Sequence, residues 1–337
     1  MKVGIVTLPL KNNYGAFLQN WALQQAIRRC GHEPVTLDRV PALPLGEWVK
    51  LNAKALIRLP FPDRRRPFLP APRQSRAGAF KRFAEERLAL TPSFSRYSPN
   101  LIPANALDCV VAGSDQIWRP AFASSALEDL YLRFAQAAEV PAFTYGASFG
   151  CDEWEYTPEQ EAACGNWIRK QQAVSVREES AVALCREHYG IRADRVVDPT
   201  LLLEASDYET LCGAVPRCEE PYLLSYVLDA GDDTDALVRD EAVRRKLKVK
   251  TIPTDVNARL GVPEWLAAFR DAAFVITDSY HGTIFSILFG KAYRCLRNSL
   301  RGNSRFDSLL SLTPETLETL KQASWHYLES NLSGKKA

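Results

Sequence analysis

Apolar and polar residues are distributed along the chain in the pattern of an α/β protein. Short, largely apolar runs, such as residues 3–8 and 274–277, predict strands that are buried on both faces. Between such runs, apolar residues recur at helical spacing, as in residues 16–30 and 232–247. Strands that alternate with helices in this way predict parallel sheets of the Rossmann-like type.

The most informative stretch is residues 262–296, which predicts a helix, a strand, a polar loop, a second helix and a second strand. The loop is the segment Asp278-Ser279-Tyr280-His281-Gly282, directly after the strand at 274–277. Thr283 is the expected N-cap of the following helix, at residues 284–289. Ligands of open parallel sheets bind beyond the carboxyl ends of the strands, and a helix N-terminus there favours anions. This loop is therefore a candidate ligand site.

Polar side chains also follow several predicted strands in the first half of the chain. They are Asn13, Ser114, Asp115, Ser148 and Arg177. The carboxyl ends of parallel strands meet at one edge of a sheet, so we expect these side chains at a common edge. Each feature alone has a plainer interpretation. Asn13 could simply make a turn, and His281 could merely cap its helix.

A break at residues 213–221 predicts a boundary between two domains, at 1–212 and 221–312. Residues 313–337 should form a terminal helix and tail. Within the first domain, residues 41–76 are a Pro-rich insertion.

The insertion lies in a basic part of the chain. Residues 61–96 contain nine Lys or Arg and three Asp or Glu, a net charge of +6, so the remaining chain sums to −4. Such a segment could meet an anionic acceptor or a membrane surface, or it could be a solvated surface excursion.

Composition narrows the protein class. The chain has 337 residues, 46% hydrophobic and 24% charged, as in a soluble protein of two domains. A net charge of +2 argues against general nucleic-acid binding. No run approaches a membrane span, and no signal peptide is evident. The eight cysteines form no CxxC pair or Cys/His cluster, so we expect free thiols in a reducing cytoplasm and no metal site.

The candidate chemistry combines fixed cations with one histidine. The cations, suited to carboxylate or phosphate, are Arg177, Arg301 and Arg305. His281 can exchange a proton near neutral pH. The acidic residues that could orient or deprotonate it are Asp115, Asp278 and Glu178. No GxSxG elbow is present, so a hydrolase triad is not expected. The set suits acid–base chemistry on a small, multiply anionic substrate.

Eight motifs, taken in order, resemble the polysaccharide pyruvyl transferase family. They are NNYGAFLQNWALQ, VVAGSDQIWRP, TYGASFG, SVREES, VVDPTLLL, PEWL, ITDSYHGTIFSILFGKAY and RGNSRFDSLL, spread over about residues 1–312. The resemblance implies two Rossmann-like domains facing across a cleft, similar to GT-B glycosyltransferases. It also implies transfer of the pyruvyl group of phosphoenolpyruvate to two sugar hydroxyls. The products are a cyclic pyruvate ketal and phosphate, and no cofactor is needed.

The resemblance also assigns roles to residues. Arg177 matches the arginine that holds the donor, and His281 matches a late histidine that usually ends an Arg-Leu-His triplet. Here the triplet is Ser279-Tyr280-His281, so the donor contact expected of the arginine must come from elsewhere. Arg301 or Arg305 could supply it, or this branch could use another donor or reaction. Further expected substrate contacts are Asn13, Ser114, Ser148, Ser279, Tyr280 and Thr283.

These assignments give a hypothetical mechanism. Arg177, Arg305 and the N–H groups of residues 283–285 bind the donor. His281 protonates the methylene carbon, and an acidic residue takes the proton of the sugar hydroxyl. The candidates for that base are Asp115 and Asp278.

Two alternatives use the same scaffold. One is a nucleotide-sugar glycosyltransferase, because fold does not determine function. The other is a non-catalytic glycan-binding relative that lost its chemistry with the missing arginine. The sequence leaves open whether the acceptor is lipid-linked, in which case the basic insertion could hold the enzyme at the inner face of the membrane.

Overall fold

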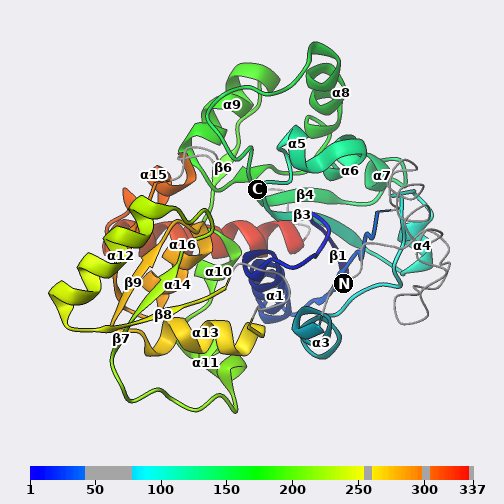
Figure 1. Ribbon diagram of the computed structural model, residues 1–337. Coiled ribbons are helices and arrows are strands. Elements are labelled where there is room, and N and C mark those ends of the chain that lie inside the picture. Colours follow the sequence, from blue (N-terminus) through cyan, green and yellow to red (C-terminus); the bar gives the residue numbers. More distant parts are fainter. Residues whose placement is uncertain (42–77, 254–259, 298–303, 334–337) are drawn as a thin grey trace, which may run out of the picture.

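The computed structural model describes residues 1–41, 78–253, 260–297 and 304–333 (Figure 1). Arg301 and all but the first residue of the Pro-rich insertion lie outside the described residues. Within the described part of the chain, no helix combines the length and the apolar character needed to cross a membrane.

The first half of the chain forms a six-stranded parallel sheet with the order β2-β1-β3-β4-β5-β6. Its strands are β1 (Lys2–Val6), β2 (Glu33–Thr36), β3 (Cys109–Asp115), β4 (Ala142–Ala147), β5 (Ser175–Val176) and β6 (Asp194–Arg195). Helices cover both faces of the sheet, so neither face is exposed to solvent. Strands buried on both faces are apolar throughout, which explains the apolar runs in the sequence.

The helical elements of this half connect and cover those strands. They are α1 (Tyr14–Arg29), α3 (Gly78–Arg87), α4 (Leu101–Ala104), α5 (Pro120–Ala123), η2 (Ser124–Ala126), α6 (Leu127–Leu130), α7 (Arg133–Gln136), α8 (Pro158–Ile168), α9 (Glu179–Tyr189), α10 (Pro199–Leu202) and α11 (Ala205–Cys212). One face of the sheet packs against α4 and α6 to α9. The other face packs against α1 and α10.

The second half forms a four-stranded parallel sheet with the order β10-β9-β7-β8. Its strands are β7 (Tyr222–Tyr226), β8 (Lys248–Thr251), β9 (Phe274–Thr277) and β10 (Ala292–Cys295), and its helices are α12 (Asp232–Arg245), α13 (Val262–Asp271), α14 (Tyr280–Leu288) and α15 (Ser304–Leu310). Helix α12 covers one face, and α11 and α13 cover the other. The fold is thus α/β with two Rossmann-like sheets, as expected.

The two halves share their cores rather than standing apart. One apolar cluster joins α1 and α3 to α13 and β7, and another joins α14 and α15 to the first sheet. The terminal helix α16 (Pro314–Leu332) follows the second half but returns to the first, where Tyr327 donates a hydrogen bond to the Thr144 carbonyl (2.8 Å). Figure 1 shows α1 and α16 where the two sheets meet. The domain boundaries drawn from the sequence stay a prediction.

One local expectation was wrong. Helix α14 begins at Tyr280, not after Thr283, because the Ser279 hydroxyl accepts a hydrogen bond from the Gly282 N–H (3.2 Å) and so acts as the N-cap. Thr283 lies inside the helix, where its N–H donates to the Ser279 carbonyl (2.9 Å). The N–H groups of residues 283–285 are therefore used within the helix. In the first turn, Ser279 accepts the Gly282 N–H, and the N–H groups of Tyr280 and His281 have no acceptor within the helix.

Candidate active site

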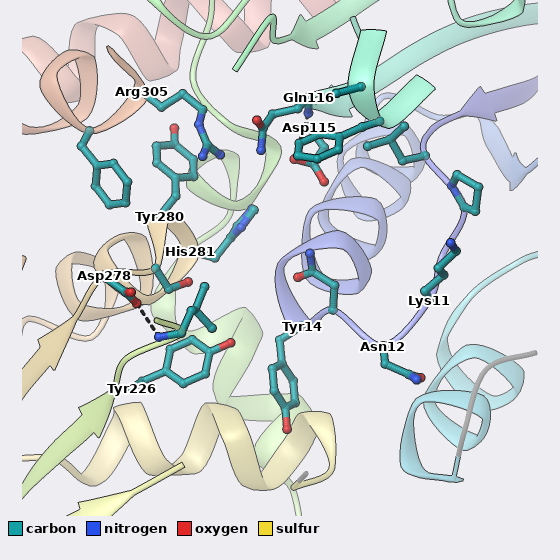
Figure 2. Close-up of a pocket in the computed structure, with 18 of the residues that line it drawn as sticks. Lys11, Asn12, Tyr14, Asp115, Gln116, Tyr226, Asp278, Tyr280, His281 and Arg305 are labelled. Atoms are coloured by element: carbon teal, nitrogen blue, oxygen red, sulfur yellow. Dashed lines mark hydrogen bonds between the residues drawn. The ribbon is translucent and has the colours of Figure 1, made fainter. Parts of the chain in front are cut away.

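Both halves contribute side chains to a cleft of about 740 Å³ at the carboxyl ends of the strands. The loop before α1, the end of β3 and α5 line one side, and the ends of β7 and β9 with α14 and α15 line the other. Figure 2 shows the labelled lining residues: Lys11, Asn12, Tyr14, Asp115, Gln116, Tyr226, Asp278, Tyr280, His281 and Arg305. The volume is within the usual range of small-molecule sites.

His281 lies where the N-termini of two helices meet. It is the second residue of α14, and its ring packs against Gly15 at the start of α1. A Cβ on Gly15 would lie only 2.0 Å from Nδ1 of His281, so this approach requires a glycine. Asn13 is the N-cap of α1, and its side chain accepts the Gly15 N–H (3.0 Å). Asn13 therefore makes the turn, and it also lines the cleft.

Asp198, to which sequence analysis assigned no role, lies behind His281. Its Oδ2 atom is 3.7 Å from Nε2 of His281 and 2.6 Å from Nη1 of Arg177. Its Oδ1 atom accepts hydrogen bonds from the N–H (3.0 Å) and hydroxyl (2.7 Å) of Thr200. Burial is the largest influence and opposes ionisation, but His281 and Arg177 outweigh it and hold the pKa of Asp198 well below its usual range. Asp198 is therefore a fixed anion beside the imidazole, whose buried Nε2 has no hydrogen-bond partner among the described residues.

The two described candidate arginines differ in depth. The side chain of Arg177 has no exposed surface, and its Cζ lies 4.8 Å from the centre of the Tyr280 ring. Among the described residues, its Nε and Nη2 atoms have no hydrogen-bond partner. Arg305 lies 5.3 Å from the same ring and lines the cleft itself. Burial, followed by the charge of Arg177, lowers the pKa of Arg305, so a bound anion would stabilise the Arg305 guanidinium. Burial also disfavours the charge of Arg177, but Tyr280 and the carboxylates of Glu178, Asp198 and Asp115 outweigh it and raise its pKa.

Asp115 and Asp278 line the cleft in different ways. Asp115 ends β3 with φ at 80°, an uncommon and strained conformation for an aspartate. Its Oδ1 accepts the Gln116 N–H (2.9 Å), and among the described residues Oδ2 receives no hydrogen bond. Asp278 instead accepts the backbone N–H groups of Leu228 (2.6 Å) and Asp229 (3.0 Å), one on each oxygen. Asp278 thus holds the loop after β7.

The remaining predicted residues lie in or behind the wall of the cleft. Ser114, Ser148 and Thr283 are completely buried. Ser114 donates a hydrogen bond to Asp198 (3.4 Å), and Ser148 donates one to Glu178, whose pKa is raised by burial. The predicted residues that line the cleft are Asn13, Asp115, Asp278, Ser279, Tyr280, His281 and Arg305.

The family follows from comparison with known proteins. The model of the family described as polysaccharide pyruvyl transferase matches residues 13–299. The chain belongs to this family. Membership identifies the protein as a transferase and indicates a role in polysaccharide pyruvylation in general. The matched range contains Gly15, Asp115, Asp198 and His281, and it ends before Arg305.

Solved structures support the fold assigned to this transferase. A protein from Listeria monocytogenes assigned as UDP-N-acetylglucosamine 2-epimerase is 10% identical, with a TM-score of 0.54, over 99% of this chain and 91% of that one. S. aureus MnaA, in a co-structure with UDP, is 12% identical, with a TM-score of 0.50 and the same coverages. At these identities the likeness shows the GT-B-like fold alone. No curated protein matches the sequence significantly.

Proposed function

We propose that this member of the pyruvyl transferase family uses phosphoenolpyruvate as donor, without a separate cofactor. The pyruvyl group is transferred to two hydroxyls of a sugar in a surface polysaccharide or its precursor. The observation that supports this most directly is the setting of His281, which lies between Gly15 and Asp198 in a cleft also lined by Arg305.

The donor carries a carboxylate and a phosphate, and the cleft offers separate cationic groups for anions. Arg305 lines it on the side of α15, and Lys11 lines it on the side of the loop before α1. The N-termini of α1 and α14 add partial positive charge around His281. In this scheme Arg305 supplies the cation that the family triplet provides through its arginine and that this chain, with Ser279 there, lacks. Arg177 acts from behind through Asp198 and Tyr280.

His281 is the proposed general acid. It gives a proton to the methylene carbon of phosphoenolpyruvate, which becomes a methyl group and leaves an oxocarbenium-like centre at the neighbouring carbon. Asp198 stabilises the imidazolium before transfer, because its carboxylate lies 3.7 Å from Nε2.

Asp115 is the better placed of the two candidate bases. Its Oδ2 receives no hydrogen bond from the described residues, whereas both oxygens of Asp278 accept backbone N–H groups. In the proposed sequence, the first sugar hydroxyl adds to the central carbon and loses its proton to Asp115. The bond from that carbon to the phosphate oxygen then breaks, and the second hydroxyl closes the ketal. The two sugar hydroxyls lose two protons in all. One of them restores the proton that His281 gave to carbon, and the other leaves with phosphate.

The test follows both products. The protein is incubated in D₂O with phosphoenolpyruvate and a panel of hexose and N-acetylhexosamine glycosides. Phosphate release is measured, and the ketal methyl group is detected by NMR. A general acid that exchanges with solvent should deliver one deuterium to that methyl group. His281→Ala should lower turnover by about 10²–10⁴-fold, the usual contribution of acid–base catalysis.

Two results would count against the proposal. Near wild-type turnover in His281→Ala would remove the acid role of His281. Transfer from a nucleotide sugar without consumption of phosphoenolpyruvate would favour the glycosyltransferase alternative.

A further inference from the structure

An aromatic ring at the cleft stands out because large apolar side chains are normally covered. Phe122 lies in the short helix α5 and is 49% exposed. The other exposed large apolar side chains of the described chain are Met1, Val243, Val249 and Leu310, at 39–79%, and none of them is aromatic. Phe122 also lines the cleft that contains His281. An exposed ring there is available to a ligand.

The ring is held in place by its neighbours. The guanidinium of Arg119 lies over it, with Cζ 5.3 Å from the ring centre. Arg119 is fixed in turn by two hydrogen bonds to Glu155, of 3.0 Å from Nε and 2.8 Å from Nη2. The Phe122 N–H donates to the Arg119 carbonyl (2.9 Å). The ring is thus restrained by Arg119 while about half of the residue's surface stays exposed to the cleft and to solvent.

The Phe122 ring is also connected, through a short buried segment of chain, to Asp115, the proposed base. Asp115 and Phe122 belong to one segment, and the two residues midway along it, Ile117 and Trp118, are completely buried. These anchors fix the distance between the proposed base and the ring before any ligand binds. A rigid element of this kind positions a substrate with little loss of entropy.

We infer that Phe122 forms the stacking platform of an acceptor subsite, and that the ligand is a pyranose ring. The C–H bonds on one face of a pyranose carry partial positive charge, which is attracted to the negative face of an aromatic ring. Asp115 and Gln116 line the same cleft as Phe122 and precede it in the same segment, so they can bind the hydroxyls of the sugar. The inference rests on the proposed function, because it places the acceptor of that reaction.

The experiment measures sugar binding separately from turnover. Saturation-transfer NMR is recorded with millimolar methyl pyranosides of glucose, galactose, mannose and N-acetylglucosamine, with phosphoenolpyruvate present. At least one pyranoside should receive saturation from the wild type. Phe122→Ala should weaken its binding by about two- to tenfold, the worth of one aromatic contact, and Phe122→Trp should retain it. The matched control, Val243→Ala, changes a 79% exposed side chain on α12 and should bind as the wild type does.

Each outcome decides between the two proposals. Equal binding by Phe122→Ala and the wild type, or no pyranoside bound by the wild type, would overturn the platform. The melting temperature with and without phosphoenolpyruvate is measured on the same samples and should rise equally in the wild type and Phe122→Ala. No rise, with sugar binding that still depends on Phe122, would contradict the donor and leave the platform standing.

Discussion

A single methyl group added at Gly15 should disable the site although no titratable residue is replaced. The Cβ of an alanine there would lie 2.0 Å from Nδ1 and 2.6 Å from Cε1 of His281. To restore the ordinary contact distance of 3.4 Å, the ring must move by about 1.4 Å. Its distance of 3.7 Å from Asp198 would change at the same time.

The expected size of the effect follows from that displacement. A misplacement of about 1 Å can cost about 10²-fold in rate, so Gly15→Ala should lower turnover by at least that factor. Stability should respond differently. Gly15 lies in the first turn of α1, and alanine is favoured over glycine in helices by about 0.5–1 kcal/mol. This gain in helix stability offsets part of the free energy that the steric clash with His281 costs, so the protein should stay folded.

The assay combines kinetics with NMR of the histidines. Phosphate release from phosphoenolpyruvate reports turnover. The chain has only four histidines, so the ring resonances of His281 can be assigned by substitution. In Gly15→Ala, the His281 resonances should shift while those of the other three stay in place.

Two controls separate the collision from a general effect of replacing glycine. Gly231→Ser adds a side chain where nothing lies within 4 Å, and it should leave turnover unchanged. In a His281→Ala background, Gly15→Ala should cost nothing further, because the colliding ring is absent. Wild-type turnover and unmoved His281 resonances in Gly15→Ala would refute the reasoning.

Three further predictions follow from buried or exposed groups. Asp198→Asn should lower the free energy of unfolding, measured in urea at pH 7, by about 3–5 kcal/mol, because it breaks a buried ion pair. Since folding lowers the pKa of Asp198, its contribution to stability is complete above its unfolded pKa of about 4 and is lost as the pH falls below it. A difference in unfolding free energy between wild type and variant that does not narrow on acidification would contradict this. The exposed Cys218 should react with Ellman's reagent at pH 8 well before Cys30, because burial, followed by the charge of Glu329, raises the pKa of Cys30 to about 11; equal labelling of both by mass spectrometry would argue against it. Asp115→Asn should lower turnover and leave the melting temperature nearly unchanged. Asp278→Asn should instead lower the melting temperature, because the new amide group would face the two backbone N–H donors that the carboxylate now accepts. If Asp278→Asn lowers turnover and Asp115→Asn lowers the melting temperature, the two roles are exchanged.

The architecture could be predicted because it depends on local patterns. The apolar run at 274–277 is strand β9 with the expected bounds, and Pro263 lies in the first turn of α13, where a missing N–H costs nothing. The polar loop after β9 brought His281 to the cleft, because the carboxyl ends of parallel strands meet at one edge.

The ion pairs and hydrogen bonds behind the cleft could not be predicted, because they join residues that are far apart in the sequence. Asp198 is locally the N-cap of the short helix α10, and only folding places its second oxygen beside His281. The strand-end rule located Arg177 and Ser148 at the correct edge but could not tell that other side chains cover them. Thr283 was mistaken for a cap because Ser279, four residues earlier, has the same capping chemistry.

The central claim is that the cleft binds phosphoenolpyruvate as the pyruvyl donor, with Arg305 as its cation. The most direct test is the melting temperature with and without millimolar phosphoenolpyruvate, for the wild type, Arg305→Ala and the control Val243→Ala. Ligand at about 100 times its dissociation constant should stabilise the fold by about 2.7 kcal/mol. The account predicts a rise in the wild type and the control that is lost in Arg305→Ala. No rise with phosphoenolpyruvate, together with a rise with UDP or a UDP-sugar, would contradict it.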